Sequence, residues 1–259
     1  MKVDLHNHTI LCNHAEGSVD QYVEAAIANG IDVFAFSDHA PMDYDPKYRM
    51  SFEQMEGYRH SVLAAKEKYK DQIEVLFAYE VDYLEGHMDE RVLKADVDFL
   101  IGSVHFIDDW GFDNPEFIGH YEHEDINVIW QKYFDQIEKM AASRLFDIAG
   151  HLDLIKVFKF MPTQEITEIA EQALLAIKAA DMVLEINVAG YRKPIAEAYP
   201  SPDLLERAFT LEIPITFGSD AHKPEQVGLY RKKAEALAKS VGYTHCATFK
   251  NRKRTLVQF

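Results

Sequence analysis

The sequence of 259 residues contains only two cysteines, Cys12 and Cys246, which lie near opposite ends of the chain. Two isolated cysteines provide neither a disulfide framework nor a CxxC metal motif, so we expect reduced thiols in a cytoplasmic protein. No apolar run approaches the roughly 20 residues that a membrane-spanning helix requires. The first residues also lack the apolar core of a secretory signal, because Asp4, His6 and His8 interrupt it. We therefore expect no membrane association and no export.

Positive charge is also scarce. The chain has 43 acidic residues against 27 Lys and Arg, which gives a formal net charge of −16. Nucleic-acid-binding proteins normally carry a basic surface, so this balance predicts that the chain has no nucleic-acid partner. A small anionic substrate would have to be held by local cations rather than by the overall field of the protein.

The chain has no Pro/Ser-rich linker, no low-complexity tract and no internal repeat. Largely apolar strand-like runs alternate with helix-like segments throughout, and no strand is followed by the GxGxxG turn typical of an open dinucleotide-binding sheet. This alternation favours a parallel (β/α) barrel with seven strands, formed by one domain over residues 1–259. The predicted strands are "KVDLHNH", "IDVFAFSDH", "IEVLFAYEVDYL", "VDFLIGSVHF", "FDIAGHLD", "MVLEINV" and "IPITFGSDAH". The predicted helices cover residues 19–29, 52–70, 126–143, 163–180, 202–210 and 225–241.

Every predicted strand ends in a side chain suited to binding a metal or an anion. The carboxyl ends of barrel strands share one face, so these side chains should converge there. Residues i and i+2 of a strand point the same way, so His6 with His8, and Asp220 with His222, can reach a common site. The nine candidate ligands are too many for one tetrahedral ion: His6, His8, His14, His39, Glu80, His105, His151, Asp220 and His222.

A simpler interpretation exists for each of these residues taken alone. One histidine at a strand end is more often a hydrogen-bonded structural residue, and an Asp-x-His after a strand can be only a helix cap. Together, however, buried ionisable groups at one end of a barrel would desolvate and repel one another without cations between them. The set therefore predicts two or three divalent ions that share a carboxylate. Asp4, Asp38 and Asp153 are candidates to hydrogen-bond the ligand histidines.

The segments "DLHNHT", "SDH", "GSVH", "GHLD" and "GSDAH" together resemble the polymerase and histidinol phosphatase (PHP) superfamily over essentially the whole chain. This resemblance implies a distorted seven-stranded (β/α) barrel that holds up to three divalent ions. Two further segments, "SVHFIDDWGFDNPEF" and "EINVAGYRKPIAEAYPSP", resemble the histidinol-phosphate phosphatase branch. The implied activity is hydrolysis of L-histidinol phosphate, a step of histidine biosynthesis.

The resemblance also implies how the ligands are shared. The first ion would take His6, His8, Glu80 and Asp220; the second would share Glu80 and add His105 and His151; the third would take His14, His39 and His222. Glu80 fits the end of the third strand, although Glu74 and Glu85 lie nearby. Such N/O ligand sets accept Zn²⁺, Mn²⁺ or Fe²⁺ without distinguishing them.

The expected mechanism is attack on phosphorus by a hydroxide that bridges two ions, since coordination lowers the pKa of water. Arg192 is the expected phosphate clamp, because guanidinium pairs with phosphate in a bidentate way, and Lys156 is a second candidate. Asp220 or His222 would protonate the leaving oxygen. In the "DDWGFD" loop, Asp113 (or Asp108 or Asp109) would bind an ammonium group, and Trp110 or Phe112 an imidazole ring.

Other functions stay open on the sequence. The nearest is a PHP phosphoesterase that acts on another small ester, such as a nucleotide or an alkyl phosphate. A phosphotyrosine phosphatase would need an open, shallow site, and an amidohydrolase often has a strand-end lysine, which is absent here. A non-catalytic metal-binding regulatory module would keep the ligands but would have no need of Arg192 or the loop. Nothing in the sequence indicates the oligomeric state.

Overall fold

The computed structural model describes residues 1–259, and seven parallel strands form its central sheet. In sheet order these are β1 (Val3–Asp4), β2 (Val33–His39), β3 (Glu74–Asp82), β4 (Phe99–Ser103), β7 (Ile148–Ala149), β8 (Val183–Asn187) and β9 (Ile215–Gly218). The first and last strands also meet, because the Leu5 amide donates to the Phe217 carbonyl at 2.8 Å and the Asp220 amide to the His6 carbonyl at 2.7 Å. The predicted seven-stranded barrel is confirmed.

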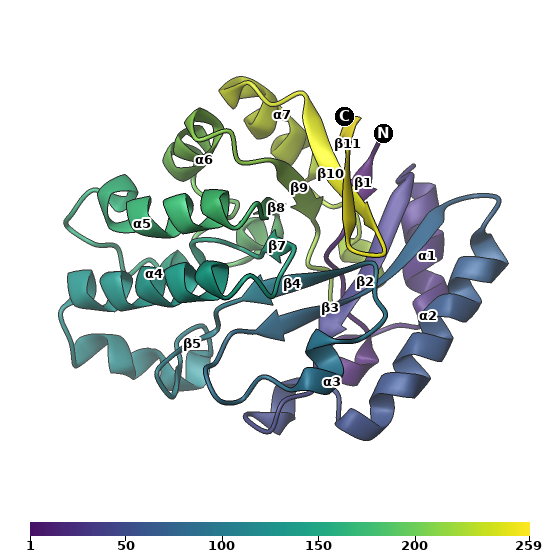
Figure 1. The fold of residues 1–259 in the computed structure, drawn as a ribbon, viewed down its shortest axis with the longest axis horizontal. Coiled ribbons are helices and arrows are strands. Elements are labelled where there is room, and N and C mark those ends of the chain that lie inside the picture. The colour runs from purple at the N-terminus through teal and green to yellow at the C-terminus, as the bar shows by residue number, and fades with distance from the viewer.

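Seven α-helices surround these strands (Figure 1). They are α1 (Val19–Ala28), α2 (Met55–Tyr69), α3 (Glu90–Leu93), α4 (Ile126–Ser143), α5 (Ile166–Ala179), α6 (Pro202–Thr210) and α7 (Arg231–Val241). The prediction of a helix from residue 225 was wrong, because Pro224–Gln226 forms a separate 3-10 turn and Gly228 follows with a φ of +70°. A left-handed residue interrupts a helix, so α7 begins only after it.

The loops between these strands and helices contain short elements. The 3-10 turns are η1 (Ile10–Cys12), η2 (Pro46–Tyr48), η3 (Phe52–Gln54), η4 (Pro115–Glu122), η5 (Leu154–Lys156), η6 (Ala189–Arg192) and η7 (Pro224–Gln226). A small antiparallel pair, β5 (Phe106–Ile107) and β6 (Trp110–Gly111), begins the long loop after β4. This loop and the one after β2 both lie at the carboxyl ends of the strands, where parallel barrels place their substrate loops.

Several strands are shorter than their apolar runs. The predicted strand at "KVDLHNH" becomes the two residues of β1 and an isolated bridge between Asn7 and Ala221. All seven strands of the barrel are nonetheless buried along nearly their whole length, as expected for strands covered on both sides. One continuous core of 73 buried apolar residues joins strands and helices from Val3 to Phe249.

The chain ends in a hairpin that the sequence analysis did not predict, β10 (His245–Lys250) and β11 (Lys253–Gln258). Its two-residue turn, Asn251 and Arg252, has positive φ at both positions, as a type I′ turn requires. The turn contacts residues that precede β4 and β7, since the Arg252 amide donates to the Asp98 carbonyl and its guanidinium to Asp147, both at 2.8 Å. The hairpin therefore covers the amino-terminal end of the barrel, opposite the strand ends that carry the predicted ligands.

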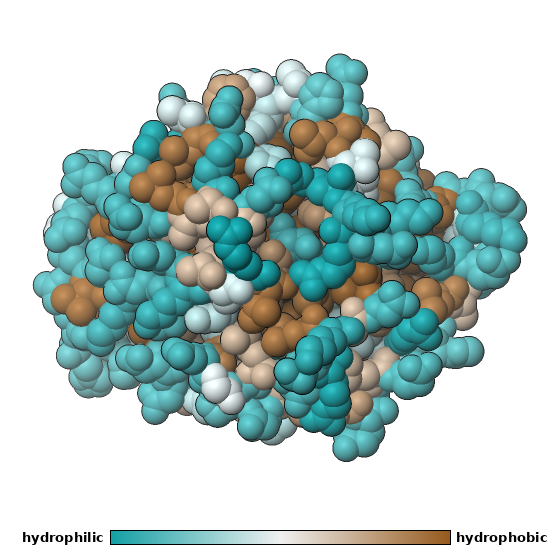
Figure 2. Space-filling model, in the orientation of Figure 1, coloured by the Kyte–Doolittle hydropathy of each residue, from teal (hydrophilic) through white to brown (hydrophobic).

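The two chain termini lie side by side (Figure 1), and the Met1 ammonium donates to the Gln258 carbonyl at 2.6 Å. Hydrophilic residues cover most of the face shown in Figure 2. None of the helices combines the length and the apolar character that crossing a membrane demands.

Candidate metal centre

One carboxylate, Glu80 at the end of β3, lies at the centre of the predicted ligands. Its Oε2 lies 3.2 Å from His6 Nε2 and 3.0 Å from His39 Nδ1. Its Oε1 lies 2.9 Å from His151 Nε2 and 3.8 Å from His105 Nε2. Both oxygens thus face imidazoles from different strands, which is the position that a carboxylate bridging two ions requires.

The remaining ligands extend the cluster on one side. His8 Nε2 lies 3.1 Å from Asp220 Oδ1, and its ring stacks on His222 with centroids 4.1 Å apart. The ring of His14 lies 4.5 Å from that of His222 and 5.5 Å from that of His39. The nine candidate residues therefore converge at one end of the barrel. In each of three triads the potential ligand atoms lie within 4.8 Å of one another: His6, His8 and Glu80; Glu80, His105 and His151; His14, His39 and His222.

Cys12 forms a fourth group of this kind with His8 and His222, which the sequence analysis did not consider. Its thiol donates to the Thr9 carbonyl at 3.1 Å. Burial raises the pKa of Cys12 above that of a free thiol, and the Asp38 carboxylate adds to this effect. The sulfur is therefore held as a neutral thiol in this structure rather than as the thiolate that binds metals.

Five of the histidines share one arrangement of their ring nitrogens. In each, Nδ1–H donates to a fixed oxygen, which orients the ring and leaves the lone pair of Nε2 free to bind a cation. The pairs are His6 with Glu185 (2.7 Å), His8 with Asp38 (3.3 Å), His14 with the Cys12 carbonyl (2.7 Å), His222 with the Asp220 carbonyl (3.1 Å), and His105 with Asp82.

The free lone pairs face other acceptors instead of donors. His6 Nε2 and Glu80 Oε2, 3.2 Å apart, are both buried without a hydrogen-bond partner, and so are Nε2 of His8 and of His222. Acceptors that oppose one another in a buried site are unfavourable unless a cation lies between them. The residues present therefore fit divalent cations of the class that accepts imidazole and carboxylate ligands.

The electrostatics of the cluster lead to the same conclusion. Burial alone would raise the pKa of Glu80, but the charges of His6 and His39 outweigh it and hold that pKa well below its usual range. Burial opposes a charge on His8, yet the adjacent carboxylates of Asp220 and Asp38 raise its pKa to about 9. In the metal-free protein, protons on such imidazoles take the place of the cations that the carboxylates require.

Two residues that orient the histidines were not assigned this role from the sequence. Glu185 on β8 accepts from His6 through Oε1 and from the His151 amide at 2.8 Å through Oε2. Glycine is required beside it, because a Cβ at Gly218 would lie 2.0 Å from Glu185 Oε1. Asp82 holds His105 and also pairs with Arg49 at 2.7 Å. Both carboxylates occupy inward positions of buried strands, and this position is the feature of the sequence that could have indicated their role.

Of the three aspartates expected to support ligand histidines, only Asp38 does so. Asp4 instead accepts from the Ser219 amide at 2.8 Å and from Asn7 at 3.1 Å, and so ties β1 to the end of β9. Asp153 pairs with Lys156 at 2.9 Å and accepts from the Ser201 amide at 2.9 Å. The expectation was wrong for these two because backbone amides and a lysine are closer to them than any imidazole.

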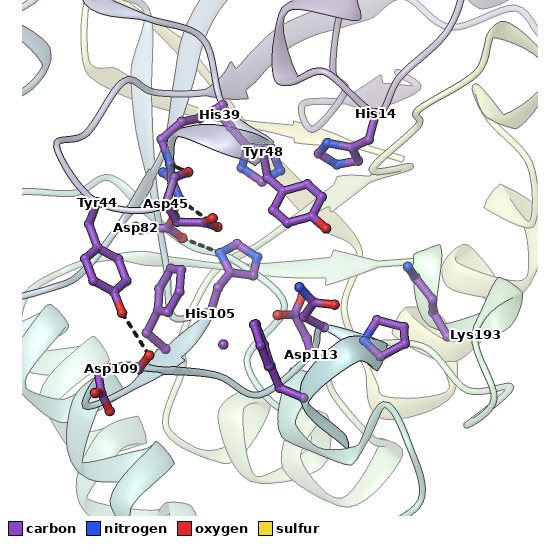
Figure 3. Close-up of a pocket in the computed structure, with 16 residues that line it drawn as sticks. His14, His39, Tyr44, Asp45, Tyr48, Asp82, His105, Asp109, Asp113 and Lys193 are labelled. Carbon is purple, nitrogen blue, oxygen red and sulfur yellow. Dashed lines mark hydrogen bonds and ion pairs between the residues drawn. The ribbon is translucent and has the colours of Figure 1, made fainter. Parts of the chain in front are cut away.

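Two adjoining cavities open over the cluster. The first, of about 350 Å³, is the metal-site cavity, and its lining includes Glu80, His151, Arg192, Asp220 and His222. The second, of about 460 Å³, is the acidic cavity. Its lining combines four carboxylates with aromatic rings: Asp45, Asp82, Asp109, Asp113, Tyr44, Tyr48, Phe106 and Phe117. Figure 3 shows His14, His39 and His105 beside this second cavity, with Asp113 and Lys193 near the same opening. Asp113 and Lys193 line both cavities.

Arg192 lies in η6, directly after β8, and reaches the metal-site cavity. Its Nη2 donates to the Ser219 carbonyl at 2.9 Å and to the Asp220 carbonyl at 2.8 Å. Its Nη1 is buried and has no partner. One half of the guanidinium is thus fixed to the end of β9, while the other half remains free to bind an anion.

Two other predicted substrate contacts lie elsewhere. Lys156 is fully buried, and its ammonium contacts Asp153, Glu197 at 2.6 Å and the Ala198 carbonyl at 2.8 Å. Trp110 stacks on His120 with centroids 4.3 Å apart and does not line either cavity. The structure therefore gives both residues structural partners, Lys156 partly in the loop after β8 and Trp110 within its own loop, whereas Asp113 does reach the opening.

Comparison with known proteins identifies the family. The family model described as "PHP domain" matches residues 4–189, and one described as "PHP-associated" matches residues 205–236. The chain is 40% identical over 255 residues to a probable histidinol-phosphatase from Deinococcus radiodurans, covering 96% of this chain and 97% of that protein. It is 30% identical over 256 residues to the histidinol-phosphatase of Bacillus subtilis, covering 88% and 96%.

The fold has a solved counterpart. A crystal structure of histidinol phosphate phosphatase from Lactococcus lactis, complexed with zinc, L-histidinol and phosphate, matches with a TM-score of 0.81 at 24% identity. The match covers 98% of each chain. With the barrel, the converging imidazoles and the matched segments together, the chain belongs to the PHP family.

Proposed function

We propose that the protein is a metal-dependent phosphatase that hydrolyses L-histidinol phosphate to L-histidinol and phosphate. The observation that carries the proposal is the set of oriented imidazoles around Glu80, whose free lone pairs face a cavity that also holds the unpartnered Nη1 of Arg192. The relatives in Deinococcus radiodurans and Bacillus subtilis, which align over nearly the whole chain, are named for this activity.

The three triads of ligand atoms support three divalent ions, one ion for each triad. Asp220 would complete the first group, because its Oδ1 lies 3.1 Å from His8 Nε2. Nitrogen and oxygen donors of this kind suit Zn²⁺, Mn²⁺ or Fe²⁺. When bound, such ions supply Lewis-acid chemistry: they lower the pKa of water and neutralise charge on a phosphoryl group.

The protein's own residues bind and orient the ester. Arg192 would donate from Nη1 to a phosphoryl oxygen while Nη2 stays bonded to the β9 end. Asp220 and His222 line the same cavity, and both have a pKa well below the usual range. Burial opposes the charge of Asp220 but is outweighed by His6 and His8, whereas for His222 burial itself lowers the pKa. We therefore propose that they relay a proton from water to the leaving oxygen rather than store one.

The acidic cavity accounts for the choice of ester. Four carboxylates beside aromatic rings suit a substrate whose far end carries an ammonium group and a flat ring. A nucleotide with several phosphates would place negative charge against Asp45 and Asp109, and a simple alkyl phosphate would leave these carboxylates unused. L-histidinol phosphate offers one phosphate, one amine and one imidazole.

We also propose that the two matched segments form one domain. Asp220 and His222 belong to the PHP-associated segment, whereas the other seven candidate ligands belong to the PHP domain segment. The shared hydrophobic core and the contacts between β1 and β9 support this arrangement.

The test is phosphate release by the purified protein with Mn²⁺ or Zn²⁺. The substrates are L-histidinol phosphate, a nucleoside monophosphate, an alkyl phosphate and a phosphotyrosine peptide, with chelator-treated protein as the control. We expect the highest kcat/KM for L-histidinol phosphate and none after chelation. A higher value for another ester would assign a different phosphoesterase, and metal binding without hydrolysis of any ester would favour a regulatory module.

A further inference from the structure

Tyr199 lines the metal-site cavity, and its hydroxyl is buried without a hydrogen-bond partner. The residue is 1% exposed, and its hydroxyl oxygen has no donor or acceptor within reach. It lines the same cavity as Arg192, His151 and Asp220, and its ring meets that of His151 edge-on at 6.5 Å between centroids. The sequence analysis did not assign a role to Tyr199, because a tyrosine outside any motif is usually a residue of the hydrophobic core.

The ring is held in place from several sides. The backbones of Asn187 and Tyr199 exchange two hydrogen bonds, of 2.7 and 2.9 Å, so the residue is fastened to the end of β8. The ammonium of Lys156 lies 5.4 Å from the ring centroid. A Cβ at Gly190 would lie 3.0 Å from the ring, so glycine there permits the close approach. The hydroxyl therefore has little freedom to turn toward another partner.

A buried hydroxyl without a partner lowers stability, so its position calls for a ligand that satisfies it. Arg192 Nη1 is a second buried donor without a partner at the same cavity. Burial raises the pKa of Tyr199, so the phenol keeps its proton and acts as a donor. Two free donors at one cavity match a group with several acceptor oxygens.

We propose that the Tyr199 hydroxyl donates a hydrogen bond to a phosphoryl oxygen of the substrate, beside the bond from Arg192 Nη1. This inference rests on the proposed function and adds a substrate-binding residue to it. Inorganic phosphate, which is released by hydrolysis of any phosphate monoester, would accept the same hydrogen bond.

The test compares Tyr199→Phe with Tyr22→Phe. Tyr22 is a matched control, because its hydroxyl is also fully buried and unpartnered but lies in α1, outside both cavities. Three quantities are measured for each protein: the metal content, the dissociation constant of inorganic phosphate in the metal-loaded state, and the melting temperature with and without phosphate. The kcat and KM for L-histidinol phosphate are measured alongside.

We expect Tyr199→Phe to keep its metal and to bind phosphate about 10- to 100-fold more weakly, as loss of one hydrogen bond to a charged group predicts. Without phosphate its melting temperature should equal or exceed that of the wild type, since an unpaired buried hydroxyl has been removed. With phosphate it should gain less than the wild type does. Tyr22→Phe should match the wild type in metal content, phosphate affinity and kcat/KM.

Phosphate affinity within twofold of the wild type would overturn the inference. So would a lower melting temperature of the phosphate-free variant or loss of its metal, because either would show that the hydroxyl already has a partner within the protein. The outcome is independent of substrate identity. If the wild type fails to hydrolyse L-histidinol phosphate, the proposed function fails, while the phosphate affinities still decide the role of Tyr199.

Discussion

The Glu185 carboxylate accepts a hydrogen bond from His6 Nδ1 at 2.7 Å, and the other ring nitrogen of His6 thereby faces Glu80 at 3.2 Å. Glu185 binds no cation itself in this arrangement, since both of its oxygens are occupied by donors from His6, His151 and Asn187. Its effect on metal binding therefore passes through the orientation of His6.

We expect Glu185→Gln to lower metal affinity about 10- to 100-fold, because the glutamine amide presents a donor where an acceptor is needed. Metal affinity is measured by competition with a chromophoric chelator. Glu171→Gln serves as the control, because Glu171 pairs with Arg207 away from the cluster. Equal affinities of the two variants would contradict the positioning role of Glu185.

A second prediction tests whether Glu80 or Glu85, which lies five residues later, is the metal ligand. Glu80 is 1% exposed and faces His6, His39 and His151, whereas Glu85 is an exposed loop residue. Glu80→Gln should lose most of its bound metal and its phosphatase activity, because the bridging position then lacks a charge. Glu85→Gln should retain both. Elemental analysis of the purified variants checks this, and metal retained by Glu80→Gln would exclude Glu80 as a ligand.

Metal binding by the metal-free protein should release protons. Burial opposes the charge of His105, but the Asp82 carboxylate outweighs it and raises the pKa of His105 to about 10; the pKa of His8 is raised to about 9. At pH 7 both rings hold a second proton, which must leave before Nε2 binds a cation. Affinity should therefore rise with pH from 7 toward about 9.

Calorimetric titration in two buffers of different ionisation enthalpy measures the number of protons released. We expect at least one proton per protein at pH 7 and fewer at pH 9. A metal affinity that stays constant between pH 6 and pH 8 would show that these imidazoles are already deprotonated or are not ligands.

Arg192→Ala should lower kcat/KM for L-histidinol phosphate by roughly 10- to 150-fold, the loss expected for a hydrogen bond to a charged oxygen. Its metal content should not change, since the guanidinium bonds only to carbonyl groups. Arg254→Ala is the control, because Arg254 pairs with Asp181 at the opposite end of the barrel. A variant with full catalytic efficiency would remove Arg192 from the phosphate site.

Lys156→Met should reduce the free energy of unfolding by about 3–5 kcal/mol, the usual effect of removing one partner of a buried ion pair. The change would leave the carboxylate of Asp153, which is fully buried, without its cation. Lys178→Met is the matched control: its contact with Glu212 is exposed, so a loss below about 1 kcal/mol is expected. Urea unfolding of the metal-free proteins measures both, and equal losses would contradict the burial argument.

The barrel and its ligands could be predicted because both depend on local pattern. Apolar runs ended by His39, Glu80 or Asp220 show where each strand stops, and parallel strands bring their ends together without further information. The hairpin was missed because β11 lies largely at the surface and contains few apolar residues, so the run resembled a loop, although β10 buries Cys246, Ala247 and Phe249.

The side chains that orient the ligand histidines were harder to predict, because this role depends on which residues are close in three dimensions. Asp153 and Asp38 both adjoin a strand-end histidine in sequence, yet only the second hydrogen-bonds an imidazole. Lys156 resembled a free cation but is neutralised by Glu197, which lies 41 residues further along the chain. Tyr199 could be recognised only from the absence of a partner, which no sequence pattern records.

The contact between β1 and β9 joins the beginning of the chain to its last third, and it places His6 and His8 next to Asp220 and His222. An incomplete polypeptide emerging from the ribosome would hold the first two imidazoles but not their partners, so full metal affinity would arise only once residues 220 and 222 have been made and the ring of strands has joined. Bound ions would then hold β1 and β9 together. Removing them should open the contact between these two strands before the rest of the molecule unfolds.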